Sequence, residues 1–178
     1  MKTVIIGFLL LGWCSYSFSQ SFKSIRSETS FFSSAPLEDI KATNTQATSL
    51  FNAENGEVAF RVPIRGFQFR KSLMQQHFNE NYLESDKYPQ ATFEGRIQGY
   101  DMQKSSAQEA WAEGTMTIHG VSRKVKIEGK FVKKSGELIL ESKFPIKVTD
   151  YDIEIPRVVF YNIAEEVEVS VLFVFKPI

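Results

Sequence analysis

Apolar and polar residues alternate along most of this 178-residue chain. A period of two puts successive side chains on opposite faces of a β-strand, so each run predicts a strand with one apolar and one charged face. Turn residues such as Asn55-Gly56 and the Lys133–Gly136 stretch separate the runs. The predicted strands are 57–64, 91–97, 112–119, 124–131, 138–146 and 167–175, with two weaker ones at 28–33 and 40–51.

One stretch, Lys71 to Leu83, breaks this alternation. Its apolar residues recur at the spacing of a helical stripe. We therefore expect one short helical insert near residues 71–84, placed between two strands and covering one end of the sheet. The stripe consists of Leu73, Met74, His77, Phe78 and Tyr82.

About eight strands in mostly sequential antiparallel order predict an all-β barrel or sandwich. The charged faces must point outward because buried, unpaired Lys and Glu are very costly, so the apolar faces meet inside. Eight strands close around an interior that side chains just fill or that holds one small ligand, and the pattern leaves both open. An outer-membrane barrel would also alternate, but the helical insert and the lack of clear aromatic girdles argue against it.

Three glycines, Gly95, Gly114 and Gly129, fall in the apolar register of separate strands. Glycine inside a strand marks a bend or the close approach of another group. Barrel curvature and a ligand passing the wall are both compatible with this pattern.

The N-terminal segment has the features of a secretory signal peptide. Lys2 precedes an apolar stretch over residues 4–13, and Ser17-Phe18-Ser19 meets the small-x-small rule for cleavage before Gln20. The apolar stretch is too short for a spanning helix, which needs about 20 residues. We expect a signal peptide at 1–19 and one domain at 20–178; a lipoprotein signal at Cys14 and a buried N-terminal strand are the alternatives.

The composition narrows the chemistry. Lys+Arg and Asp+Glu both number 21, which argues against a nucleic-acid partner, since such proteins carry a basic face. The chain has 16 Phe but only 2 His and 1 Cys, and the histidines lie far apart in sequence, so we expect no metal site, no cofactor and no enzymatic activity. Structural roles are favoured for His77 and His119, and exposed positions for Asp150 and Asp152. Arg65 and Arg70 are either solvated or placed to meet an anionic headgroup.

Four local motifs, within residues 73–93, 114–125, 142–156 and 163–169, resemble those of the YceI-like family in order and spacing. They include Lys87-Tyr88-Pro89, His119-Gly120 and Asp150-Tyr151-Asp152. The resemblance covers about residues 57–171. It implies an extended, lipocalin-like antiparallel β-barrel with a long apolar tunnel that binds polyisoprenoid or other long-chain amphiphiles in the periplasm. The chain departs from the family pattern before Glu57, which leaves the closure of the barrel by its first strands open.

The resemblance and the strand faces together predict a periplasmic or secreted protein that binds a long-chain lipid or isoprenoid for sequestration or transport. A structural or protein-interaction domain with a filled core is the alternative, and transient membrane contact and a homodimer are left open. The expected lining is Phe60, Val62, Phe93, Ile97, Met116, Ile118, Ile127, Phe131, Leu140, Phe144, Val169 and Phe173, with Phe67, Phe69, Leu73, Met74, Phe78 and Tyr82 near the mouth.

Overall fold

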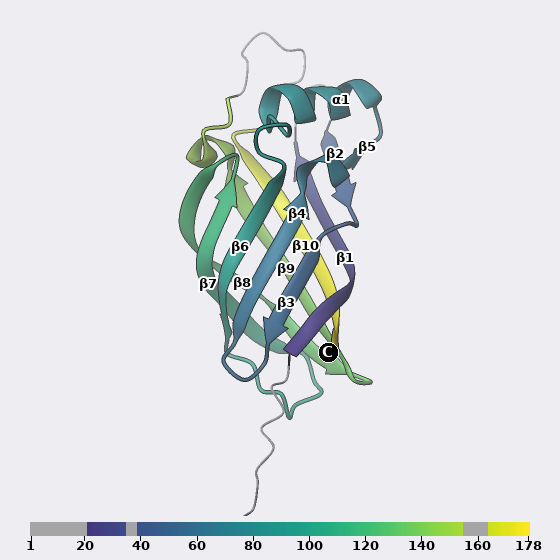
Figure 1. Cartoon of the computed structure of the whole chain (residues 1–178), viewed down its shortest axis with the longest axis vertical. Helices are drawn as coiled ribbons and strands as arrows, with labels where there is room; N and C mark the ends of the chain where they lie inside the picture. The colour runs from purple at the N-terminus through teal and green to yellow at the C-terminus, as the bar shows by residue number, and fades with distance from the viewer. Residues whose placement is uncertain (1–20, 35–38, 155–163) are drawn as a thin grey trace, which may run out of the picture.

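Ten strands form one continuous antiparallel sheet in the computed structural model, which describes residues 21–34, 39–154 and 164–178. The predicted signal peptide at 1–19, with Cys14, lies outside the described residues. Figure 1 shows the strands wound into a barrel with the helical segment across one end. The strands are β1 (Ser21–Ser33), β2 (Ile40–Asn44), β3 (Thr48–Asn52), β4 (Glu57–Pro63), β5 (Gln68–Phe69), β6 (Gln90–Gln98), β7 (Gln108–Ile118), β8 (Val121–Lys134), β9 (Glu137–Lys147) and β10 (Glu166–Pro177).

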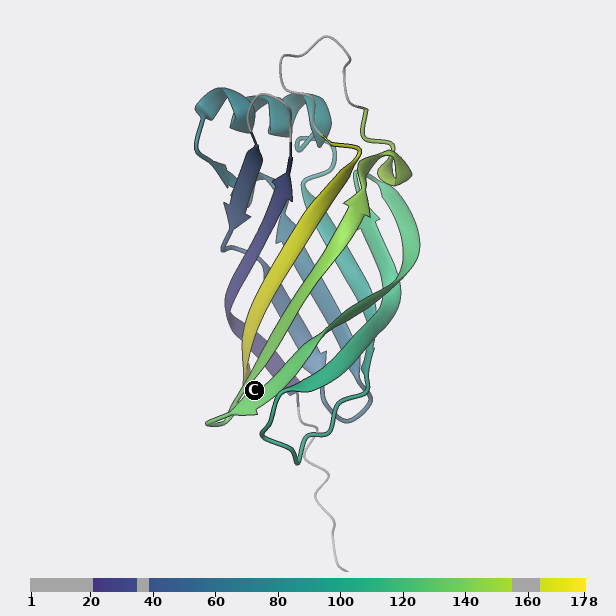
Figure 2. The same cartoon turned by 180° about the vertical axis from the view of Figure 1, so that it is seen from behind.

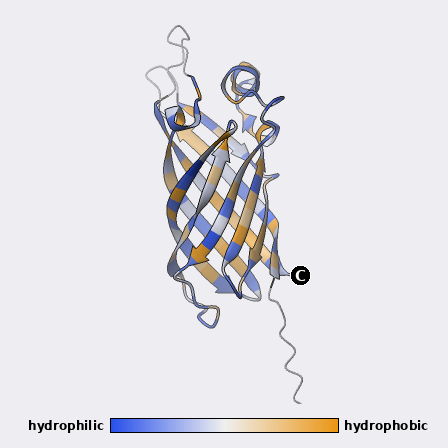
Figure 3. Ribbon diagram, turned by 60° about the vertical axis from the view of Figure 1, so that its left-hand side comes forward, coloured by the Kyte–Doolittle hydropathy of each residue, from blue (hydrophilic) through white to orange (hydrophobic). Residues whose placement is uncertain are grey.

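The barrel closes because β1 pairs with both β10 and β3. The closed ring runs β1-β3-β4-β6-β7-β8-β9-β10, while β2 and β5 extend beside β1. This confirms the predicted all-β, lipocalin-like barrel of about eight strands. Apolar and polar residues alternate along the strands, as the colours of Figure 3 show, and the apolar faces form one interior core.

Strand β1 is longer than the predicted strand 28–33, and a β-bulge hides its pattern. The pairing with β10 shifts between Ser24 and Arg26, which leaves Ile25 as the extra, exposed residue. A bulge of one residue reverses the faces of the strand that follows. Phe22 is therefore buried before the bulge and Thr29 after it, although they differ by an odd number of positions.

The predicted strand 40–51 is two strands. The end of β1 (Thr29–Ser33) pairs with β2 and its start (Ser21–Lys23) pairs with β3, so both strands run antiparallel to β1 and the pairing is interrupted at Thr45–Ala47. Asn44 fixes this break: it is fully buried, its Nδ2 donates to the Pro63 carbonyl at 2.7 Å, and its Oδ1 accepts from the Gln46 amide at 2.7 Å. The carbonyl and amide that the break leaves unpaired are thus satisfied by one side chain.

The three glycines of the apolar register mark close approaches between strands. A Cβ at Gly95 would lie 2.3 Å from the Glu113 carbonyl oxygen, and one at Gly114 would lie 2.3 Å from that of Glu94. At Gly129 the corresponding distance is 2.6 Å, to the Glu141 carbonyl. The strands themselves therefore account for these glycines, which supports the barrel-curvature interpretation.

The two ends of the barrel differ. The helix end carries α1 (Ser72–His77), the π-helical turn η2 (Phe78–Tyr82) and the 3-10 turns η1 (Ile64–Gly66) and η3 (Val148–Tyr151). The hairpin end carries the β8–β9 hairpin and the C-terminus (Figure 2). Together α1 and η2 confirm the helical insert predicted near 71–84.

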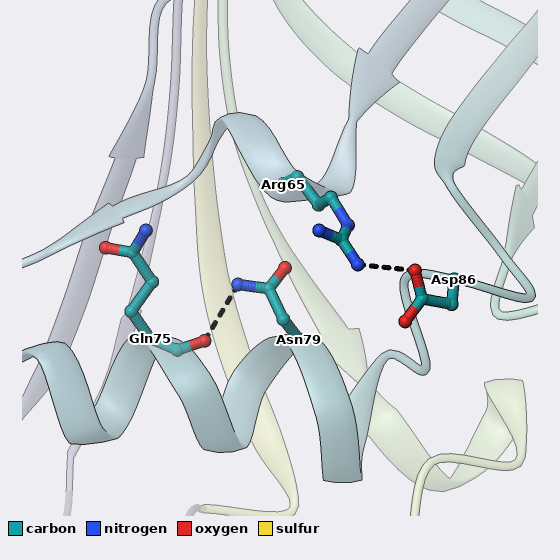
Figure 4. A network of polar contacts seen from close by, with 4 residues as sticks. All are labelled: Arg65, Gln75, Asn79 and Asp86. Atoms are coloured by element: carbon teal, nitrogen blue, oxygen red, sulfur yellow. Dashed lines mark hydrogen bonds and ion pairs between the residues drawn. The ribbon is translucent and has the colours of Figure 1, made fainter.

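Polar contacts hold the helical segment in place (Figure 4). The Asn79 Nδ2 donates to the Gln75 carbonyl at 2.8 Å, one turn back along the segment. The Arg65 guanidinium forms an ion pair with the Asp86 carboxylate, which ties η1 to the loop that follows η2. Both partners are mostly exposed, so this pair adds little to stability and serves mainly to fix the loop.

Candidate ligand-binding cavity

The barrel encloses an apolar cavity of about 280 Å³. Inward-facing residues of β4, β6, β7, β8, β9 and β10 form its wall, and α1 and η2 contribute its cover at the helix end. This volume is close to the lower bound of small-molecule sites, about 300 Å³. Such a space can hold a slender apolar chain, and it has few polar groups to react with one.

Aromatic and branched side chains shape the middle of the cavity. The Phe60 ring lies 4.7 Å from the Phe173 ring and 6.1 Å from the Phe93 ring, between centroids. These rings come from β4, β10 and β6, which are brought together by closure of the barrel. Rigid rings at these positions present apolar area without loss of side-chain freedom on binding.

Packed aromatic residues fill the hairpin end below the cavity. Phe51 lies at the centre of this floor, with ring centroids 6.0 Å from Phe131, 5.5 Å from Tyr100 and 6.4 Å from Phe175. Phe131 and Phe175 are fully buried, and Tyr100 donates its hydroxyl to the Ala53 carbonyl at 3.0 Å. The cavity is therefore closed at this end by side-chain packing.

A second aromatic group lies beneath the helical cover. The Phe78 ring lies 5.5 Å from those of Phe31 and Phe67 and 5.0 Å from that of Phe69. Tyr82, on the same helical face, is buried, and its burial raises the pKa of its hydroxyl above 10.0, so the ring stays neutral. These rings, from β1, β5, the η1–β5 connection and η2, cover the cavity at the helix end.

The structure brings all but two of the predicted lining residues onto the cavity wall. Phe131 is the first exception: it packs in the floor, against Phe51 and Tyr100, one layer below the cavity. Leu73 is the second, with 54% of its surface exposed. A helix turns about 100° per residue, and the buried face follows Met74, Phe78 and Tyr82, which leaves Leu73 facing solvent.

Sequence reasoning missed several wall residues. Phe31 lies behind the β1 bulge, where the alternation had changed phase, and so was not assigned to the interior. Ile64 and Leu83 fall at the ends of the predicted strand 57–64 and of the predicted helical insert, and the predicted lining does not include them. Val148 and Ile153 lie in turns at the helix end, where no strand or helix period indicates a face. The alternation of a strand gives no information about such turn residues.

Few polar groups reach the cavity. Thr29 is buried, lines the wall, and its Oγ1 has no hydrogen-bond partner among the described residues. His77 also lines the cavity beneath the cover, and among the described residues its ring makes no hydrogen bond that would support the structural role favoured for it. The wall of the cavity is otherwise mostly apolar, which favours binding by burial.

The family motifs meet at the helix end and support the fold. His119, in the β7–β8 turn, contacts the Glu84 carboxylate through Nε2 at 2.8 Å and the Tyr151 carbonyl through Nδ1 at 3.2 Å. The Tyr88 ring packs on the His119 ring at 4.6 Å, and a Cβ at Gly120 would lie 2.5 Å from Tyr88. Three separate loops are thereby joined, in line with the structural role favoured for His119.

The polar residues considered as chemical candidates lie apart from one another. Asp150 and Asp152 are exposed at η3, and Arg65 is paired with Asp86 on the surface. In the part of the chain that the structure describes, no three His, Cys, Asp or Glu residues converge on a point that could hold a metal ion. None of the described helices has the length and apolar character needed to cross a membrane.

The fold and the cavity place the chain among closed antiparallel β-barrels with an apolar interior, the lipocalin-like class. Within that class, the YceI-like domain matches residues 18–175, and the chain belongs to this family. No curated protein matches the chain.

Solved structures agree on the fold. A polyisoprenoid-binding domain from Saccharophagus degradans, implicated in plant cell wall breakdown, has a TM-score of 0.75 at 13% identity, covering 89% of this chain and 99% of its own. Burkholderia cenocepacia BcnA has a TM-score of 0.69 at 17% identity, covering 83% of this chain and 95% of its own. The Campylobacter jejuni YCEI protein has a TM-score of 0.55 at 13% identity, covering 100% and 90%.

Proposed function

We propose that this protein binds a long-chain amphiphilic lipid or isoprenoid in the barrel cavity, for sequestration or transport in the periplasm or outside the cell, without chemically changing it. The observation that carries the proposal is the apolar cavity between two packed aromatic layers. Its family and the polyisoprenoid-binding domain among its structural neighbours support the same ligand class. Transient membrane contact and a homodimer, which the sequence leaves open, are not part of the proposal.

The binding energy comes from burial of the chain. Each CH₂ group moved from water to an apolar site gains about 0.8 kcal/mol, so about ten carbons gain on the order of 8 kcal/mol before the loss of ligand motion is subtracted. No reactive side chain is needed for this. A domain with a filled core, the alternative function, would have no such space, and the cavity favours the binding function over it.

Native mass spectrometry and lipid extraction of purified protein test the proposal. We expect an apolar or amphiphilic molecule to co-purify, or to bind when farnesol is added. A protein that is isolated empty and takes up neither farnesol nor the apolar probe N-phenyl-1-naphthylamine would contradict the proposal.

A pair of neighbouring substitutions locates the site. Met116 is buried in the cavity wall, and Thr115 points to the other side of β7. Met116→Arg puts a charge in the apolar space and should weaken probe binding at least tenfold, because an unpaired buried charge is costly. Thr115→Arg is the matched control and should bind as the unmodified protein does; circular dichroism checks that both variants fold.

A further inference from the structure

The wall of the barrel is open between β8 and β9 toward the helix end. The two strands pair only from Gly129 opposite Ser142 down to the hairpin. Val121–Glu128 of β8 and Lys143–Lys147 of β9 are therefore not paired with each other. Their other edges are paired, to β7 and β10. Figure 2 shows β8 curving away from β9 in this half of the barrel. We call this opening the β8–β9 slit.

Burial is low along the two strands that border the slit. From Val121 to Lys130 and from Ile139 to Lys147 no residue is buried, although the apolar side chains there face inward. Below the slit, where the strands pair, Phe131 and Leu138 are fully buried. The strands beside the slit thus lack the tight packing of the floor, and aromatic packing covers both ends of the cavity.

The cavity reaches the outer surface at the lower end of the slit. Glu128 and Glu141 belong to the outward faces of their strands, yet both border the cavity, as do Gly129 and Ser142 between them. The same four residues also border a depression on the outer face of the barrel. The inner space and the outer surface are therefore separated here only by backbone and by one small side chain.

The sequence explains why the two strands do not pair along the slit. Extending their register would set Lys124 opposite Lys147 and Lys126 opposite Pro145. Like charges directly opposite each other destabilise a strand pair. Pro145 has no N–H to donate to a ladder, and proline in a sheet is confined to edges and bulges. Lysine and proline at an open edge also oppose the addition of a further strand, which argues against a peptide as occupant.

Local contacts hold both ends of the slit. The Arg123 Nε donates to the Asp150 carbonyl at 2.9 Å, which ties the start of β8 to η3. At the other end the Ser142 hydroxyl donates to the Glu128 carbonyl across the two strands. The opening is therefore a built feature of bounded length.

The rim is basic toward the helix end. Lys124 and Lys147 are exposed and make no ion pair with another described residue, whereas Lys126 contacts Glu113 at 3.5 Å and Lys143 contacts Glu168 at 2.7 Å. Glu128 and Glu141 lie at the lower end, and Glu166 lies opposite Lys147 on β10. An anionic group would thus be attracted to the upper half, between Lys124 and Lys147.

We infer that the β8–β9 slit is a lateral portal, through which a long-chain amphiphile enters the cavity and at which its anionic headgroup stays bound between Lys124 and Lys147. This inference rests on the proposed function, since it requires an apolar chain in the cavity. It adds the route of access and the charge of the headgroup.

Charge reversal at the rim tests the headgroup site. Farnesol and farnesyl phosphate share one tail and differ in charge, and each is titrated against bound N-phenyl-1-naphthylamine. The Lys124→Glu/Lys147→Glu variant should bind farnesyl phosphate at least tenfold more weakly and farnesol within twofold of the unmodified protein. Lys104→Glu/Lys134→Glu, with the same change of charge at exposed positions of the hairpin end, is the matched control and should leave both affinities unchanged.

A covalent bridge tests the route. In a Cys14→Ser background, Lys124→Cys/Lys147→Cys is joined by a bis-maleimide linker, and Lys104→Cys/Lys134→Cys is joined in the same way as control. Stopped-flow fluorescence should show probe uptake at least tenfold slower for the bridged slit than for the control.

The outcomes separate the two proposals. Equal uptake rates, or loss of farnesol and farnesyl phosphate binding to the same degree, would overturn the portal and leave the cavity function standing. Failure of the unmodified protein to bind either ligand or the probe would overturn the proposed function and the portal with it.

Discussion

Phe131 and Phe173 separate the packed floor from the cavity wall, and truncation of each gives a different expected result. Both side chains are almost fully buried, at 0% and 1% exposure, so the apolar area withdrawn from water is similar. Phe131 is enclosed by packed rings, with Tyr100 at 4.9 Å and Phe51 at 6.0 Å. Phe173 faces the cavity on one side and the Phe60 ring, at 4.7 Å, on another.

The magnitudes follow from what each ring contacts. Phe→Ala in a core costs about 3–5 kcal/mol, and the cost grows with the void that is left. Phe131→Ala opens a new void in a filled layer and should lower the free energy of unfolding by about 4–5 kcal/mol. A side chain beside an existing space has fewer contacts to lose, so Phe173→Ala should cost about 3 kcal/mol. In a chain of this length, that difference amounts to a few degrees in Tm.

Urea denaturation followed by circular dichroism measures the stability, and N-phenyl-1-naphthylamine titration measures the cavity. Phe173→Ala should alter probe affinity, since it enlarges the site, while Phe131→Ala should leave it unchanged at temperatures where the variant is folded. Equal losses of stability, or a change in probe affinity for Phe131→Ala alone, would refute the assignment of Phe131 to the floor and of Phe173 to the wall.

Three further predictions concern the break in the sheet, alkaline pH and the slit. Asn44→Ala should lower the free energy of unfolding by about 1–3 kcal/mol, since two backbone groups lose their partner; exposed Asn81→Ala is the control, and urea denaturation measures both. Burial raises the pKa of Tyr82, Tyr100 and Tyr151 above 10.0, so their contribution to stability is fully present below that pH and is lost as the pH rises through the raised values; Tyr100→Phe should reduce this alkaline loss in denaturation series. Pro145→Val/Lys147→Glu should close the slit by restoring a donor and an attractive pair, so hydrogen exchange should slow at residues 124–128, and unchanged exchange would contradict the explanation of the slit.

The fold could be predicted where alternation was uninterrupted. Strand β4 begins at Glu57 as predicted and ends one residue earlier, and the inward faces of β6 to β10 follow from the same rule. The first strands could not be assigned so well. The bulge at Ile25 reverses the faces of β1, and the break after Asn44 divides one polar run into two strands that share β1 but have different second partners, β5 and β4.

The residues of the candidate site could likewise be predicted only in part. The rule of alternation identifies which side of a strand faces inward, but the height of a residue along the barrel depends on strand register and tilt. Phe131 is inward-facing as predicted, yet it lies in the floor because its ring packs against Phe51 and Tyr100 near the hairpin end. Leu73 fits the helical stripe, but only one helical face can meet a barrel end.

The slit, in contrast, left signals in the sequence that strand prediction does not use. A run of alternating residues shows that a strand forms but says nothing about whether both of its edges are paired. Pro145 within the predicted strand 138–146, and lysines on the outward faces of both neighbouring strands, are the features that proteins use to keep strand edges apart. In a closed barrel such features would only weaken the wall, unless an opening at that place serves a purpose. The polar face of these strands predicts which side is exposed to solvent, and its lysines and proline therefore also indicate where the barrel opens.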